Sequence, residues 1–468
     1  MRKRANLSSL LDPRAIAVIG APPTPGRVGH ILLEGLLRSG IPLYPVHPDA
    51  REVAGLPTLP DVESLPDNVD VAVITLRADR AVEAAEACAA RGIPHLIPVA
   101  GGFGEAGDAG KALEARLRAI PEHRATRILG PNTLGIFLPH KNLDTLFVDH
   151  GDKALAAGGG VAFITQSGSV GVEALGLAAG IGFGLRAFVG LGNKCDLDEL
   201  DFLHHFAADP GTTCLAFYLE SLDTGRTFLQ AAAEVSPSKP VVVLKAGKTA
   251  TGARAAASHT GRLAGSDRVV DGALRQFGIL RVFDDEELSD AARTLALVPP
   301  PGGNRVAIVS PAGGYGVMGA DHIESRHRGT PLTMATLAGR TRARIRAEAP
   351  PFASVANPVD LTAGADNAMF AAALDALLED DGVDIVLCVA FFAPPAVTDG
   401  LITEVAKRAA AEVKPILVFS SNGPNTDRYL RRFHDAGVAG FPSISRAVRA
   451  ARFLVERGEL LKAMRGGG

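Results

Sequence analysis

The chain has 468 residues, of which 47% are hydrophobic and 21% charged, and its formal net charge is −3. This balance is typical of a soluble globular protein of roughly three domains, and the weak negative charge argues against a nucleic-acid partner. The sequence contains no run of about 18 apolar residues, so we expect no membrane-spanning segment. The four cysteines form no C-x-x-C pair, so we expect a cytoplasmic protein without a metal site.

Three short apolar runs, at residues 15–19, 161–164 and 306–309, predict buried parallel strands. Each run is followed by small residues and then by a helix-like segment. This is the βα unit of a doubly wound sheet, in which ligands bind beyond the carboxyl ends of the strands. The sequence therefore predicts an α/β protein.

The first turn, at residues 20–29, resembles a dinucleotide-binding loop but lacks the G-x-G-x-x-G pattern. Its proline-rich insert widens the loop, which suits a bulkier or differently angled phosphate ligand. Asp49 follows the next expected strand, 43–46, where a nicotinamide enzyme uses an acidic residue to bind a ribose hydroxyl. An NAD-dependent enzyme is therefore one alternative.

The segments that begin with the second and third runs match each other. Residues 161–172 and 306–317 share glycines and apolar positions at one fixed offset. Three further pairs of segments follow in the same order: 193–197 with 357–361, 239–243 with 414–418, and 274–278 with 433–437. One domain type is therefore expected to occur twice.

The two expected copies differ in length around one histidine. Pro240 and Gly278 are 38 residues apart, whereas their counterparts Pro415 and Gly437 are 22 apart. The extra segment holds His259 within a run of small residues that we expect to form a loop. A loop found in one copy is not needed for the fold, and an imidazole can act as a nucleophile near neutral pH. The alternative is a solvent-exposed loop histidine.

Two more features of the first copy point to the same edge of the sheet. Glu220 ends the expected strand 214–219, and its ungapped counterpart in the second copy is Phe391. Residues 166–171 would present free backbone N–H groups at the start of a helix, which suits a phosphate. The alternatives are a solvated loop residue for Glu220 and a simple helix cap for the serines at 167 and 169.

Six short segments, in order and spacing, resemble the alpha subunit of NDP-forming acyl-CoA synthetases of the ADP-forming acetate–CoA ligase type, in the succinyl-CoA synthetase superfamily. They are residues 130–135, 167–171, 192–196, 245–248, 258–261 and 265–267. The resemblance implies a CoA-binding Rossmann-like domain at 1–140 and a flavodoxin-like domain with a phosphohistidine loop at 155–298. A second flavodoxin-like domain, without the histidine, is implied at 303–462.

The resemblance also implies roles for individual residues. His259 would become phosphorylated, Glu220 would hydrogen-bond it, and a helix N-terminus would receive the phosphate through Ser167, Gly168 and Ser169. Coenzyme A would be held by Gly20, Ala21, Thr24, Gly26, Arg27, Arg51, Pro131 and Asn132. The chain departs from the usual family pattern at Pro22, Asp49 and Arg77.

The implied reaction interconverts an acid, CoA and ATP with acyl-CoA, ADP and phosphate, through an acyl phosphate and phospho-His259. ATP or ADP and magnesium would be bound by an ATP-grasp beta subunit, so a hetero-oligomer acting on a small carboxylic acid or acyl-CoA is expected. The main alternative is a non-catalytic CoA- or acyl-CoA-binding regulatory protein of the same fold.

Overall fold

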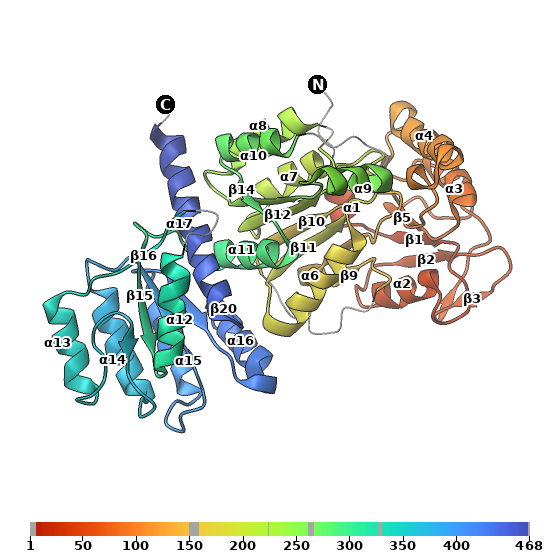
Figure 1. Cartoon of the computed structure of the whole chain (residues 1–468). Helices are drawn as coiled ribbons and strands as arrows, with labels where there is room; N and C mark the ends of the chain where they lie inside the picture. Colours follow the sequence, from red (N-terminus) through yellow and green to blue (C-terminus); the bar gives the residue numbers. More distant parts are fainter. Residues whose placement is uncertain (1–5, 149–158, 223, 261–265, 326–329, 467–468) are drawn as a thin grey trace. The chain divides into compact units, whose positions relative to one another are not determined.

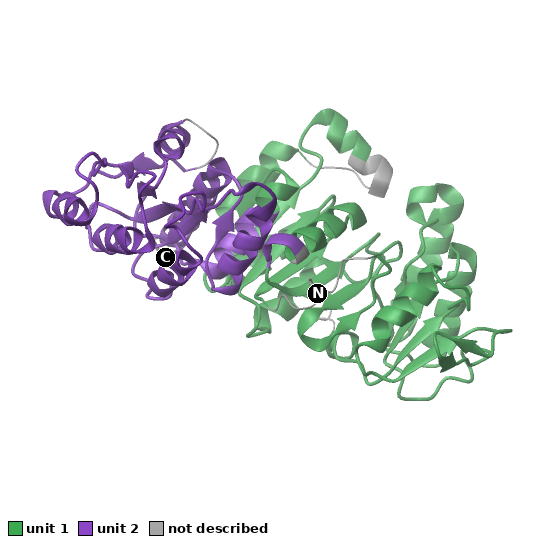
Figure 2. Cartoon of the chain, turned by 90° about the horizontal axis from the view of Figure 1, so that it is seen from below, with its two compact units in different colours: residues 1–179, 184–288 green, residues 180–183, 289–468 purple. Residues whose placement is uncertain are grey.

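The computed structural model describes residues 6–148, 159–222, 224–260, 266–325 and 330–466 (Figure 1). The chain separates into two compact units (Figure 2). Unit 1 comprises residues 1–179 and 184–288, and unit 2 comprises residues 180–183 and 289–468. Both units are built from largely parallel sheets covered by helices, which confirms the predicted α/β fold class.

The first sheet of unit 1 is parallel and contains the expected strands near 15–19 and 43–46. Its order is β2 (Leu43–Val46), β1 (Ile16–Ile19), β5 (Val71–Ile74), β6 (His95–Pro98) and β7 (Arg127–Ile128). The elements around it are α1 (Ser8–Leu11), α2 (Val28–Leu37), β3 (Glu52–Val53), β4 (Leu56–Pro57), α3 (Ala78–Ala90), η1 (Gly104–Ala106) and α4 (Asp108–His123). Because β1 and β5 are fully buried apolar runs, they form the centre of the sheet.

The second sheet of unit 1 is parallel in its central strands and has two antiparallel strands at one edge. Its order is β14 (Leu280–Val282), β13 (Val241–Lys245), β12 (Cys214–Leu219), β10 (Val161–Thr165), β11 (Leu185–Gly190), β8 (Ile136–Leu138) and β9 (Leu143–Asp144). Strand β8 pairs with β11, although its residues fall within the range 1–140 expected for the preceding domain. The three domain boundaries stay predictions.

Helices flank this second sheet. They are α6 (Gly168–Ile181), α7 (Glu199–Ala208), α8 (Gly225–Val235), α9 (Ala250–Thr260) and α10 (Asp267–Gln276), with η2 (Pro139–Lys141) beside β8. Helix α7 begins at a capping box, in which the Asp198 carboxylate accepts hydrogen bonds from the first-turn N–H groups and the Asp201 carboxylate accepts one from the Asp198 N–H. Aromatic side chains of α7 and α8, including Phe202 and Phe228, pack against one face of the sheet.

Unit 2 holds one sheet of parallel strands. Its order is β16 (Thr333–Met334), β15 (Arg305–Ser310), β18 (Ile385–Val389), β19 (Ile416–Phe419) and β20 (Gly440–Phe441), and β17 (Val359–Asp360) also pairs with β15. The helices are α11 (Asp285–Leu297, shared with unit 1), α12 (Gly313–Glu324), α13 (Gly339–Glu348), α14 (Asn367–Leu378), α15 (Gly400–Ala409), η3 (Gly423–Asn425), α16 (Thr426–Asp435) and α17 (Ile444–Gly466). In the described part of the chain, no helix is long and apolar enough to cross a membrane.

Strand register confirms most of the predicted duplication. Val161 of β10 faces Cys214 of β12, and the matching Val306 of β15 faces Ile385 of β18. Continuing this register, Glu220 corresponds to Phe391, as predicted. The registers of β13 with β14 and of β19 with β20 likewise support the matches of 239–243 with 414–418 and of 274–278 with 433–437.

One predicted match, of residues 193–197 with 357–361, is wrong. Thr165 of β10 pairs with Gly190, whereas the corresponding Ser310 of β15 pairs with Asp360. Asp360 therefore corresponds to Gly190. The shared Asn and Asp-Leu residues had instead matched it with Asp196, six residues later. The helix α13 inserted before β17 lets a similar sequence occupy a different place in the second sheet.

The segment before His259 is also not the loop that we predicted. Helix α9 runs from Ala250 to Thr260. Alanine is the best helix former, and this segment contains five alanines, so its small residues favour a helix rather than a free loop. The helix lies beside η1 of the first sheet's domain.

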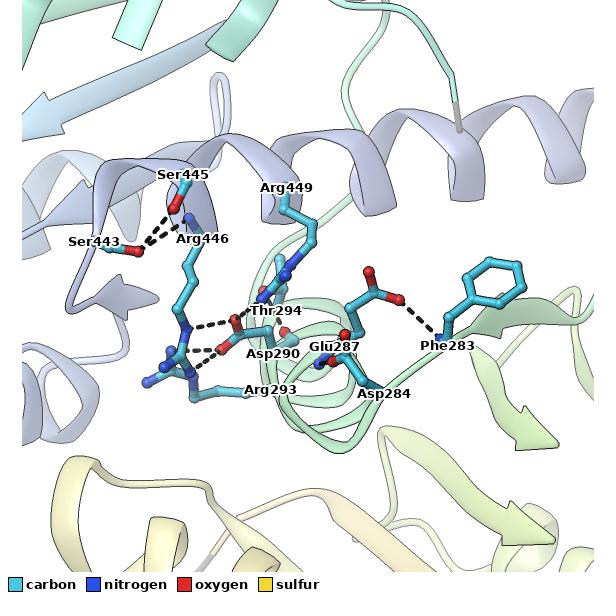
Figure 3. A network of polar contacts seen from close by, with 10 residues as sticks. All are labelled: Phe283, Asp284, Glu287, Asp290, Arg293, Thr294, Ser443, Ser445, Arg446 and Arg449. Carbon is cyan, nitrogen blue, oxygen red and sulfur yellow. Dashed lines mark hydrogen bonds and ion pairs between the residues drawn. The ribbon is translucent and has the colours of Figure 1, made fainter. Parts of the chain in front are cut away.

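Unit 2 contains a buried carboxylate shared by three arginines (Figure 3). The Asp290 side chain is 1% exposed and accepts two hydrogen bonds of 2.8 Å from Arg446 on α17. Arg449 and Arg293 lie 3.3 and 3.4 Å from its oxygens. Burial lowers the pKa of Arg293 to about 10 despite Asp290, and the Arg293 guanidinium also stacks 4.7 Å from the centroid of Phe441. Asp290 thus ties α11 to α17.

We expect Asp290→Asn to destabilise the packing of α17 by about 3–5 kcal/mol, because the substitution removes the charge that the buried Arg293 faces and that Arg446 of α17 binds. Protection of the α17 amides against hydrogen exchange measures this loss. The matched control is Asp381→Asn, whose carboxylate is 96% exposed and pairs with Arg340 at the surface. Equal protection in the two variants would contradict the role of Asp290.

Candidate functional site

The carboxyl ends of β10, β12 and β13 meet at one edge of the second sheet, as neighbouring parallel strands must. The turn from β10 into α6 is fixed by Thr165, whose Oγ1 accepts from the Ser167 N–H at 3.0 Å and donates to the Ser167 carbonyl at 2.8 Å. Ser310 makes the same two bonds with Ala312 in unit 2. This turn therefore belongs to the duplicated fold.

The three residues of the expected phosphate cradle stand at the start of α6. Gly168 opens the helix, and the hydroxyls of Ser167 and Ser169 lie 3.1 Å apart. Ser167 is buried, whereas Gly168 and Ser169 are exposed. The first N–H groups of a helix have no partner within the helix, so this end offers donors and partial positive charge to an anion.

Glu220 follows β12 directly and is only 7% exposed, which contradicts the alternative of a solvated loop residue. Burial, and then the nearby Glu220 carboxylate, raise the pKa of Tyr218 to about 12. Tyr218 and Glu220 are two residues apart at the end of a strand, so their side chains point to the same face. A buried carboxylate at the ligand-binding edge of a parallel sheet is a candidate functional group.

Sequence reasoning gave no role to three side chains that surround Glu220. Gln166, Lys194 and Lys245 all donate hydrogen bonds to residues 220–221 or accept them from there. Lys194 is fully buried and forms a 2.9 Å ion pair with Glu199. Burial raises the pKa of Glu199, although the charge of Lys194 opposes that rise. A sequence signal was available for Lys245, because it ends the apolar run 241–245, where a lysine would be buried and would need a partner.

The described residues do not include the side chain of His259. Its backbone belongs to α9, which follows the segment 246–249 that leaves β13. The segment 261–265 also lies outside the described residues. The predicted contact between His259 and Glu220 therefore stays a prediction.

The expected CoA loop joins β1 to α2 in the first sheet. Gly20 has φ +84°, and a β-carbon built there would lie 2.4 Å from Leu76 Cδ2, so only glycine fits without displacing Leu76. Ala21 is buried, whereas Thr24, Gly26 and Arg27 are exposed. The loop thus has a fixed base and a solvent-facing tip.

The remaining expected CoA residues lie in two places. Asn132 donates its backbone N–H to Ala100 just beyond β6, and the Pro131 carbonyl accepts from the Asn193 N–H. Both are therefore tied to the carboxyl side of the first sheet and to the loop that carries Lys194. Arg51 and Asp49 are exposed in the segment after β2, and Arg77 forms a surface ion pair with Asp79.

Unit 2 has a cavity of about 580 Å³ at the corresponding edge of its sheet. Its lining is mostly small or apolar and includes Gly313 at the start of α12, Asp360 and Phe391. Phe391 contacts the ring of Tyr315, with centroids 5.7 Å apart. The second copy thus presents an aromatic ring where the first presents Glu220.

Three known families match successive parts of the chain. A "CoA binding domain" matches residues 14–139, a "Succinyl-CoA ligase like flavodoxin domain" matches 158–295, and a "Ligase-CoA domain" matches 306–458. The fold and these matches define a CoA ligase of the succinyl-CoA synthetase superfamily.

Individual relatives narrow this class. The chain is 34% identical over 461 residues to the acetate–CoA ligase [ADP-forming] II subunit alpha of Pyrococcus furiosus, covering 96% of this chain and 98% of that one. It is 35% identical to the acetate–CoA ligase [ADP-forming] I of Archaeoglobus fulgidus, covering 96% of this chain but 63% of the relative.

A solved structure agrees with these relatives. The acetyl-coenzyme A synthetase 1 of Ca. Korarchaeum cryptofilum, in complex with phosphate and ADP, superposes with a TM-score of 0.87 at 32% identity and covers 99% of both chains. The chain belongs to the family of ADP-forming acyl-CoA synthetase alpha subunits, and it is an acid–thiol ligase of that family.

The geometry at Gly20 gives a test of the CoA loop. We expect Gly20→Ala to weaken CoA binding at least about tenfold, because the new β-carbon must displace Leu76 and shift the turn. Isothermal titration calorimetry with CoA measures the change.

The matched control for Gly20→Ala is Gly92→Ala. Gly92 has φ +83° but no atom within 4 Å of a β-carbon, so it shares the backbone strain without the clash. If both variants bind CoA equally well, the turn at Gly20 does not shape the CoA site.

Proposed function

We propose that this chain is the CoA-binding, phosphohistidine-carrying subunit of an NDP-forming acyl-CoA synthetase. Phosphate attacks the thioester carbonyl of acyl-CoA, which gives an acyl phosphate and, after the thiolate takes a proton, free CoA. An imidazole nitrogen of His259 then attacks phosphorus, and the carboxylate of the acid leaves. ADP finally accepts the phosphoryl group from His259, and the reverse sequence makes acyl-CoA from ATP.

Each residue of the candidate site has a physical part in this relay. Glu220 accepts a hydrogen bond from the second imidazole nitrogen, fixes the tautomer and opposes the positive charge that develops on the ring. The N–H groups and hydroxyls at Ser167, Gly168 and Ser169 hold the phosphoryl oxygens. The loop at Gly20, with Ala21, Thr24, Gly26 and Arg27, and the more distant Arg51, Pro131 and Asn132, hold CoA.

The contrast between the two copies carries this proposal. Both copies keep the hydroxyl-fixed turn before a helix, at Thr165 and Ser310. In the first copy a buried carboxylate, Glu220, follows β12, the neighbour of β10 in the sheet, where the second copy has Phe391 after β18. Each copy forms its own sheet with the same strand arrangement at its centre, so the fold does not require Glu220, whereas a reaction at this edge would.

The nucleotide half of the relay is assigned to a partner with an ATP-grasp fold that binds ATP or ADP and magnesium. Two observations support this assignment. The Pyrococcus furiosus relatives are named as alpha subunits. The chain spans only 63% of the Archaeoglobus fulgidus ligase, so that enzyme has further sequence beyond the shared part. The protein would then act as a hetero-oligomer on a small carboxylic acid.

Phosphorylation tests the proposal. The chain and the partner that co-purifies with it are incubated with γ-labelled ATP and magnesium, and we expect acid-labile, base-stable label on this chain. His259→Asn should abolish the label, and Glu220→Gln should slow labelling by about tenfold or more. Persistent label in His259→Asn would remove the histidine from the mechanism.

The control for His259→Asn is His123→Asn, because His123 is exposed at the end of α4 in the first sheet's domain. This variant should label like the wild type. A wild-type chain that binds CoA but never becomes labelled would instead indicate the regulatory CoA-binding protein of the same fold.

A further inference from the structure

The peptide groups of Glu220 and Ser221 are buried just beyond the end of β12, where they need partners other than a neighbouring strand. Both residues are buried, at 7% and 5% exposure. A buried backbone N–H or carbonyl without a hydrogen bond costs about 1–3 kcal/mol, so such groups are almost always paired. Here the partners are side chains.

Gln166 binds the two N–H groups. Its Oε1 accepts from the Glu220 N–H at 2.7 Å and from the Ser221 N–H at 3.0 Å. Its Nε2 lies 3.3 Å from the Ser221 hydroxyl. Gln166 directly precedes Ser167, so one residue connects the phosphate cradle to the backbone of Glu220.

Two buried lysines bind the two carbonyls. Lys245, the last residue of β13, donates to the Glu220 carbonyl at 2.8 Å and to the Ala246 carbonyl at 2.7 Å. Lys194 donates to the Ser221 carbonyl at 3.0 Å and to Glu199 at 2.9 Å. Side chains from three different strand ends therefore saturate all four backbone groups of residues 220–221.

The second copy of the fold lacks every part of this arrangement. The register places Pro311 at the position of Gln166 and Ser420 at that of Lys245. The segment 362–366, which corresponds to the loop of Lys194, contains no lysine. Glu220 itself corresponds to Phe391, so the three side chains and the carboxylate are present together or absent together.

A lysine that both copies share behaves differently. Lys239 precedes β13 and donates to the carbonyls of Phe206 and Asp209, at 3.2 and 2.6 Å. Its counterpart Lys414 donates to the Asp380 carbonyl at 2.5 Å. Burial lowers the pKa of both Lys239 and Lys245, so the two lysines are chemically alike. Only the one beside Glu220 is specific to the first copy.

We propose that Gln166, Lys194 and Lys245 are positioning residues that fix the backbone of Glu220, and with it the direction of its carboxylate, for the phosphohistidine step. This inference rests on the proposed function. The four hydrogen-bonded N–H and carbonyl groups fix the backbone of residues 220–221 at the end of β12. They therefore set the direction in which the Glu220 side chain leaves the backbone before the imidazole arrives, which lowers the ordering cost of the reaction.

The test compares Lys245→Met and Gln166→Met with Lys239→Met in the chain assembled with its co-purifying partner. The rate of labelling from γ-labelled ATP and the lifetime of the label after removal of ATP are both measured. We expect Lys245→Met and Gln166→Met to slow labelling and to shorten the lifetime by at least about tenfold. Lys239→Met should leave both within about twofold of the wild type.

A double-substitution comparison separates positioning from general instability. In a Glu220→Gln background, Lys245→Met should cause no further loss of labelling rate, because the carboxylate it positions is gone. CoA affinity, measured by calorimetry, should be unchanged in all variants that fold. If Gln166→Met fails to fold, Lys245→Met alone decides the result.

Three outcomes are distinguishable. Wild-type labelling in Lys245→Met, or a full further loss in the Glu220→Gln background, overturns the positioning role. Equal losses in Lys239→Met and Lys245→Met also overturn it, since they would show a purely structural effect. Absence of label on the wild-type chain, or its persistence in His259→Asn, would instead overturn the proposed function.

Discussion

The burial of the peptide groups that follow β12 is the constraint on which the candidate site depends. A strand inside a parallel sheet satisfies its backbone through its neighbours, but the chain must leave the sheet to reach the ligand-binding edge. At residues 220–221 the chain does so while still buried, and side chains replace the neighbouring strands as hydrogen-bond partners. The same contacts that stabilise this exit also fix Glu220, so stability and function share one set of residues.

The duplication separates what the fold needs from what one copy adds. Both copies keep the hydroxyl that closes the first turn, at Thr165 and Ser310. Both also keep a lysine, Lys239 before β13 and Lys414 before β19. These contacts stabilise the sheet wherever it occurs. The polar groups around Glu220 occur once, and an aromatic cluster of Tyr315, Phe391 and Phe419 takes their place in unit 2. One scaffold thus supports a polar edge and an apolar edge.

Much of the fold was predictable because short apolar runs and the residues that follow them are local signals. The strands near 15–19, 161–164 and 306–309 and the end of β12 before Glu220 follow from such signals. The roles of Gln166, Lys194 and Lys245 do not, since their contacts join the ends of different strands. The match of 193–197 with 357–361 is wrong because it rested on shared residue types alone. The loop predicted near His259 is a helix because alanine favours helices.

The alanine-rich helix α9 sets how far a residue near its end can reach. His259 lies nine residues after Ala250, or about 13 Å along the helix axis at 1.5 Å per residue. One turn spans about 5.4 Å as helix, whereas the same residues extended span about 12 Å. Gain or loss of a single turn would change the reach of His259 by several ångströms while β13 and the sheet edge stay fixed.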